Sequence, residues 1–140
     1  MMVDIEDLLT KPYWIVDILP KQVPDDAGGQ YFTIEKFFLS PPHVDAIYHK
    51  FANVLLKLNC YVDLAVFKVE DESRVENPAP DDLERLVLER RPLFVVLKQS
   101  QAMLSITGED HNMTVYGPND DTLALISAIA SSECLYVWKP

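Results

Sequence analysis

The chain has 140 residues, 49% of them hydrophobic, and it carries 22 acidic against 12 basic side chains, a formal net charge of −10. That composition is too apolar for a disordered acidic tail, and its excess of acids argues against a nucleic-acid partner, whose phosphates are bound by Lys and Arg. The length indicates one domain, residues 1–140. Two cysteines, an acidic N-terminus and the lack of an apolar run of about 18 residues predict a cytoplasmic protein with no membrane contact.

The first predicted element is a strand over residues 13–19, which are rich in β-branched and aromatic types and end at Pro20. Prolines, aspartates and two glycines then predict a mobile loop near 20–30. Residues 31–39 are ambiguous. Their alternation of Phe32 and Ile34 with polar residues favours a strand, which would be the return arm of a long hairpin.

The clearest helix is predicted over residues 41–59, where apolar residues follow helical spacing from Val44 to Leu58. Ser40 is a candidate cap for its start. Residues 61–69 alternate as a strand. The segment near 70–80 is rich in acids and prolines and predicts an acidic loop.

The second half predicts two more helices, near 81–90 and 119–130, the latter with Asn119 as a plausible cap. Three short strands at 93–97, 102–107 and 112–116 are close enough in sequence to form an antiparallel meander. A last strand is expected at 134–138. The fold class is therefore α+β, a single domain with a mostly antiparallel sheet of about six or seven strands and three helices packed on it.

The expected core follows from the apolar faces of these elements. Both cysteines, Cys60 and Cys134, are expected to be small buried hydrophobes without a disulfide. The side chains expected in the core are Phe51, Leu55, Phe94, Val96, Ile126 and Ile129.

No catalytic residue, cofactor or metal site is predicted. His43, Asp45 and His49 lie on one helix, but the two histidines are about 120° apart around its axis, and Asp45 and His49 belong to a polar stripe typical of a solvated face. Gly108–His111 has ordinary turn composition. The chain has neither a phosphate-binding glycine loop nor a CxxC pair.

Two groups of residues are candidate binding sites. The first is the acidic segment, here defined as Glu70, Asp71, Glu72 and Glu76, which could attract a basic protein partner. The second is a polar face of the predicted meander, which strand alternation places on one side of the sheet. Its members are Ser105, Thr107, Asn112, Thr114 and Tyr116.

These observations lead to two functional hypotheses. The first is a small acidic protein-binding or inhibitory module, similar in charge and size to an immunity protein, acting as a monomer or small homo-oligomer. The alternative is a small-molecule sensor or accessory domain that uses the polar sheet face. An enzyme is the least favoured class, because no set of catalytic side chains has the required spacing.

Overall fold

The computed structural model describes residues 4–107 and 111–140 and confirms the α+β class. Gly108, Glu109 and Asp110 of the predicted turn lie outside the described residues. The five described helices are α1 (Ile5–Leu8), α2 (Tyr31–Phe38), α3 (His43–Leu58), α4 (Pro80–Leu88) and α5 (Asp120–Ser132). Within the described ranges, no helix is long and apolar enough to cross a membrane.

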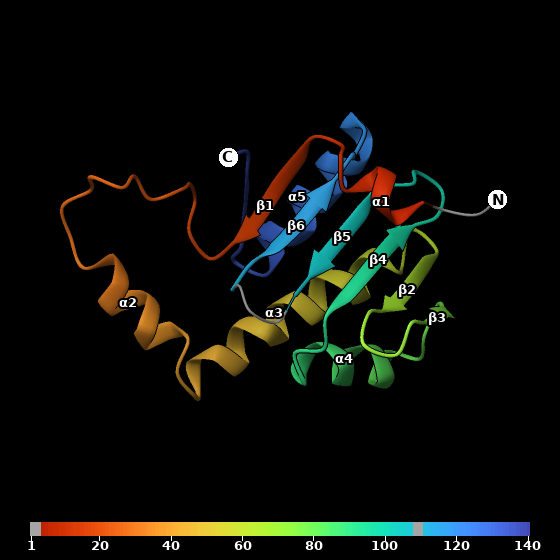
Figure 1. Ribbon diagram of the computed structural model, residues 1–140, viewed down its shortest axis with the longest axis horizontal. Helices are drawn as coiled ribbons and strands as arrows, with labels where there is room; N and C mark the ends of the chain where they lie inside the picture. The colour runs from red at the N-terminus through yellow and green to blue at the C-terminus, as the bar shows by residue number, and fades with distance from the viewer. Residues whose placement is uncertain (1–3, 108–110) are drawn as a thin grey trace.

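Seven strands of the described chain form one sheet, in which every pairing is antiparallel. The strand order is β3-β2-β4-β5-β6-β1-β7 (Figure 1). The predicted meander is confirmed as β4, β5 and β6. The strands are β1 (Tyr13–Asp17), β2 (Leu64–Lys68), β3 (Ser73–Glu76), β4 (Leu93–Leu97), β5 (Met103–Ile106), β6 (Met113–Tyr116) and β7 (Tyr136–Trp138).

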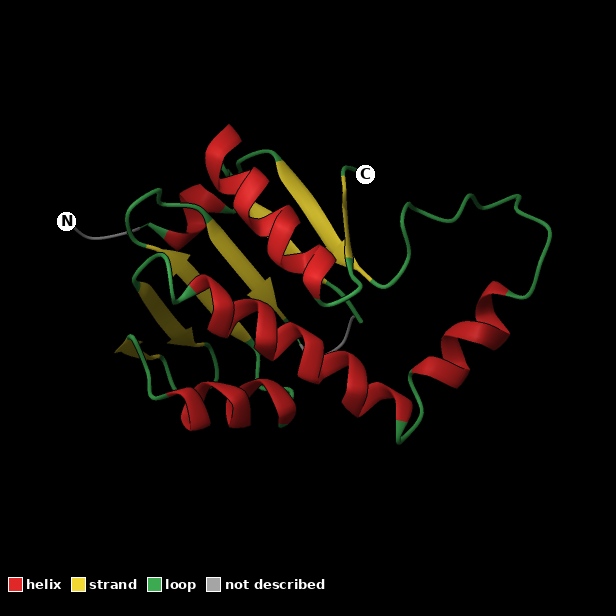
Figure 2. Ribbon diagram, turned by 180° about the vertical axis from the view of Figure 1, so that it is seen from behind, coloured by secondary structure: helices red, strands yellow, loops and turns green. Residues whose placement is uncertain are grey.

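One face of the sheet is covered by α3, α4 and α5 (Figure 2). Strand alternation turns residues such as Val66, Val95 and Leu104 toward these helices, where all three are fully buried. Phe51 of α3 is also fully buried, and burial of a large aromatic side chain contributes strongly to such a core. The prediction that the α3 apolar stripe is buried is therefore confirmed.

The opposite, outer face of the sheet is only partly covered. Leu8 of the short helix α1 packs there with Ala65, Val96 and Met103. Phe94 also lies on this face and is only half-buried, so its assignment to the buried core was wrong. The reason is that β4 is apolar at every position, which gives no indication of which face is better covered.

Residues 31–39 are not a strand, because Tyr31–Phe38 is the helix α2. The predicted hairpin had no free edge to pair with: β1 pairs with β6 on one side and with β7 on the other. The alternation of Phe32 and Ile34 spans too few residues to distinguish the two periods. The described loop before α2 is exposed along almost its whole length.

Three smaller expectations also need correction. Ser40 does not cap α3; its hydroxyl donates to the Lys36 carbonyl oxygen at the end of α2, 2.7 Å away. Cys60 and Cys134 are exposed free cysteines, because each lies in the turn that follows a helix rather than on a buried face. The acidic segment is not wholly a loop, since Ser73–Glu76 forms β3 and pairs with β2.

Candidate functional site

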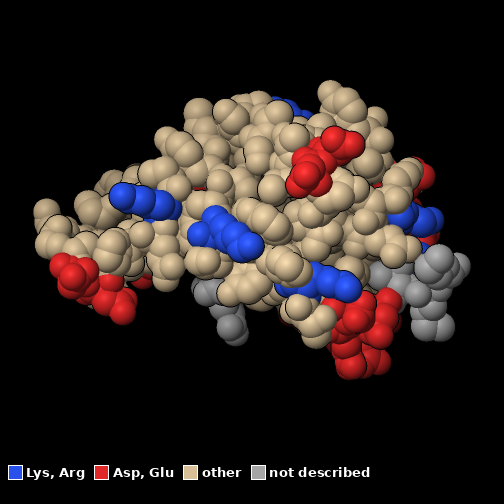
Figure 3. All heavy atoms as spheres, turned by 90° about the horizontal axis from the view of Figure 1, so that it is seen from above, with Lys and Arg blue, Asp and Glu red and all other residues tan. Residues whose placement is uncertain are grey.

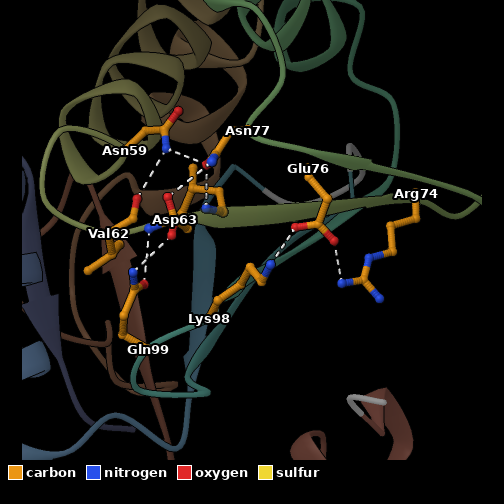
Figure 4. Close-up of polar contacts among 9 residues, drawn as sticks. Asn59, Val62, Asp63, Arg74, Glu76, Asn77, Lys98 and Gln99 are labelled. Atoms are coloured by element: carbon orange, nitrogen blue, oxygen red, sulfur yellow. Dashed lines mark hydrogen bonds and ion pairs between the residues drawn. The ribbon is translucent and has the colours of Figure 1, made fainter. Parts of the chain in front are cut away.

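The acidic segment lies at one end of the sheet, on the β2–β3 hairpin and the edge strand β3. Its carboxylates are largely matched by bases: Glu70 contacts Arg91 at 2.7 Å, and Asp71 lies 4.0 Å from Lys68. Glu76 contacts both Lys98, at 3.0 Å, and Arg74 (Figure 4). The charge that this segment presents is therefore smaller than its sequence indicates.

Hydrogen bonds hold the tip of this hairpin. The Asp71 carboxylate accepts from the Ser73 hydroxyl at 2.5 Å and from the Ser73 backbone N–H at 3.1 Å. The hydroxyl contact is the main reason that the pKa of Asp71 is lowered. The neighbouring Glu72 has a positive φ of 56°, as expected for a tight turn. The segment is thus an ordered hairpin.

A polar network that the sequence did not reveal joins the end of α3 to this region (Figure 4). The Asn77 side-chain oxygen accepts from the Leu64 backbone N–H and from the Asn59 amide, both at 2.9 Å. The Asn77 amide donates to Asp63 at 3.0 Å, and the Gln99 amide donates to the other Asp63 oxygen at 3.1 Å. These contacts satisfy one another, so we assign the network a structural role.

The polar sheet face is less open than its composition indicates. The register places Ser105 opposite Thr114, so both lie on one side of the sheet, its outer face. Ser105, however, is only 7% exposed, and Thr114, Asn112 and Tyr116 are half-buried, whereas Thr107 is exposed. Burial is the main cause of the raised pKa of Tyr116. A ligand could reach only part of this face.

The most unusual feature is an arm, here defined as residues 18–42, which includes α2. It leaves the sheet after β1 and extends away from the body before the chain returns as α3 (Figures 1 and 2). No residue of α2 is buried. Phe32 is 80% exposed, and Phe37 is 53% exposed. Exposed aromatic side chains gathered on one short helix are typical of an interaction site.

The inner face of α2 contacts the body through a few groups. Tyr31 and Glu35 lie one helical turn apart, and the Tyr31 hydroxyl donates to the Glu35 carboxylate at 2.7 Å. This hydrogen bond raises the pKa of Tyr31 to about 12. The same Glu35 oxygen lies 3.5 Å from Nε2 of His111, two residues before β6. The contact attaches the arm near the end of β1 and the start of β6.

Asp17, at the end of β1, adds a buried carboxylate to this area. It is 5% exposed, and its Oδ1 accepts from the Ile18 N–H at 2.7 Å. Burial is the largest effect on its pKa and raises it, while the Ile18 hydrogen bond and the charge of His111 act in the opposite direction. Asp17 was not a predicted site residue, since nothing in a strand ending in Asp distinguishes a buried carboxylate from an exposed one.

A hollow of about 330 Å³ lies between the arm and the body. Its apolar lining comes from Ile18, Leu19, Phe38, Ala46 and Ile47. The other lining residues are His43 and Lys50 of α3 and Cys134 in the turn after α5. His43 stacks against Phe37, with ring centroids 4.1 Å apart. The sequence shows these α3 residues on a helix but does not show that the arm returns beside them.

The predicted polar stripe on α3 is used in part for packing. Asp45 pairs with Arg90 at 3.0 Å, and His49 is exposed. Farther along, Asn53 and Lys57 bind Glu133 at 2.9 and 2.6 Å, which ties α3 to the end of α5. In the described part of the chain, no three His, Cys, Asp or Glu side chains are placed to hold a metal ion.

Comparison of the chain with protein-family models, with curated proteins and with solved structures finds no match.

Proposed function

We propose that this chain is a protein-binding module that contacts its partner through the arm. The supporting observation is that α2 has no buried residue although it carries three phenylalanines and an isoleucine. An isolated helix of eight residues is marginal in water, so a partner that covers its aromatic side chains would stabilise it substantially. Helix-in-groove recognition uses side chains of this kind as anchors.

The charge distribution favours a basic partner. The chain has a net charge of −10, and Asp25 and Asp26 are exposed on the arm. Figure 3, in which the arm forms the left end, shows acidic side chains at its tip and basic ones nearer the body. A partner with an apolar groove bordered by Lys or Arg would complement the aromatic and acidic side chains together. Its attraction would mainly raise the association rate.

The acidic segment is the second candidate contact surface. It stays a prediction. It offers less unpaired negative charge to a partner than its sequence indicates, because three of its four acids have basic neighbours. The arm is favoured because exposed aromatic side chains contribute more binding energy per residue than exposed, already paired carboxylates.

The test is affinity capture from a host-cell extract followed by reconstitution with the purified partner. One variant carries Phe32→Ser and Phe37→Ser, and the control carries Tyr61→Ser, which removes a 69% exposed aromatic side chain outside the arm. We expect the arm variant to raise the Kd at least about 30-fold, as for a hot spot of about 2 kcal/mol. The control should bind as the wild type does.

A third variant separates the arm from the acidic segment. It replaces Glu70, Asp71, Glu72 and Glu76 with their amides. We expect the salt dependence of association to change only as much as the loss of these negative charges accounts for. If the arm variant binds normally while this variant loses binding, the contact lies on the acidic segment and the proposal for the arm is wrong.

A further inference from the structure

We propose that the hollow between the arm and α3 binds a small apolar carboxylate, with its hydrocarbon part in the hollow and its carboxylate on Lys50. This site is separate from the protein-binding role proposed for the outer side of the arm. Its volume of about 330 Å³ falls in the range of small-molecule sites, which are mostly apolar with a few polar groups.

Most side chains that line the hollow are apolar. Ile18 and Leu19 follow β1, Phe38 ends α2, and Ala46 and Ile47 lie on α3. Cys134 follows α5, so four separate segments meet at the hollow. Apolar surface that these segments leave facing water is covered favourably by a hydrocarbon chain, at roughly 25 cal/mol per Å².

The positive charge at the hollow comes from Lys50, a half-buried residue that belongs to the lining. Most Lys and Arg side chains of the described residues form an ion pair or stack on an aromatic ring. Among these residues, Lys50 forms neither kind of contact. Glu133 influences it electrostatically, yet that carboxylate is already bound by Lys57 and Asn53. A lysine that lines the hollow and has no ion pair is a suitable partner for a carboxylate.

His43 also lines the hollow. Its Nδ1 is buried and has no hydrogen-bond partner in the described structure, so this atom is shielded from the hollow and the rest of the ring forms the lining. Lys50 is therefore the side chain that offers a charge at the hollow, and an anion complements its ammonium.

The probe is octanoate, compared with octan-1-ol, which has the same chain without the charge. We expect calorimetric titration of the full chain to show saturable binding of octanoate at one site, with octan-1-ol at least about tenfold weaker. Lys50→Met, which keeps most of the side-chain volume, should weaken octanoate about tenfold and leave octan-1-ol unchanged. The matched control is Lys36→Met, which removes an exposed lysine of α2 outside the hollow and should have no effect.

Ala46→Trp provides a second test that does not depend on Lys50. Ala46 is exposed at the hollow, so the larger ring can fill the space without entering the core, and binding of both probes should be lost. The proposal is overturned if octanoate does not bind saturably, if octan-1-ol binds equally well, or if folded Lys50→Met or Ala46→Trp protein binds octanoate as the wild type does.

Discussion

At the scale of single residues, Asp17 shows how the fold places a charge where the solvent cannot stabilise it. Its carboxylate is 5% exposed at the end of β1, and burial raises its pKa above 3.8. Between the unfolded and folded pKa values the folded state therefore binds more protons. The free energy of unfolding falls as the pH rises through this window, and the loss is complete above the folded pKa.

Asp17→Asn is accordingly expected to raise the free energy of unfolding at neutral pH. The amide keeps an oxygen that can accept from the Ile18 N–H and removes the buried charge. Below pH 3.8 the gain should vanish, because Asp17 is then protonated in both states. Urea unfolding at the two pH values measures both effects.

Asp26→Asn, in the exposed loop of the arm, is the control for the general effect of one negative charge fewer. If Asp17→Asn is no more stabilising at neutral pH than this control, then burial of the Asp17 charge does not lower stability as we infer.

At the scale of elements, α2 differs from the other long helices because it lacks a buried side. Helix α3 buries eight of its residues, whereas α2 buries none. Most helical stability in proteins comes from packing of an apolar face rather than from propensity. The arm therefore belongs to the parts of the molecule that open most easily.

Amide hydrogen exchange of the free chain tests this difference. We expect the amides of α2 to exchange with an opening free energy near zero, and those at the centre of α3 with a value close to that of global unfolding. Protection of α2 equal to that of α3 would show that something covers it. If that protection increased with protein concentration, the cover would be a second copy of the chain.

The elements also show what could be predicted from the sequence. The helix from His43 to Leu58 and the meander of β4, β5 and β6 follow from long periodic patterns and short connections. Helix α2 was missed because eight residues with few polar positions fit both the period of a strand and the period of a helix. Its i, i+3, i+7 set of Tyr31, Ile34 and Phe38 was the signal for a helix, but a short apolar run does not reveal whether a strand edge is free to pair.

At the scale of the whole molecule, the net charge of −10 was visible in the sequence, but its distribution was not. Glu70 lies beside Arg91 and Glu76 beside Lys98, pairs that are 21 and 22 positions apart in the chain. Such pairs depend on how β2, β3 and β4 are brought together, which local patterns do not specify. The same holds for the hollow, whose lining comes from the end of β1, from α2 and α3, and from the turn after α5.

Three surfaces of the molecule are candidates for the contact with a partner: the arm, the acidic segment and the polar sheet face. They lie on separate elements, α2, the β2–β3 hairpin and the outer side of β5 and β6. A footprint of the bound partner can therefore distinguish them without any substitution.

The most direct measurement is amide hydrogen exchange of the reconstituted complex compared with the free chain. We expect the strongest new protection over Tyr31–Phe38, with no comparable change over residues 70–76 or Met113–Tyr116. A complex that protects residues 70–76 or Met113–Tyr116 and leaves α2 as exchangeable as in the free chain would contradict the assignment of the arm as the contact surface.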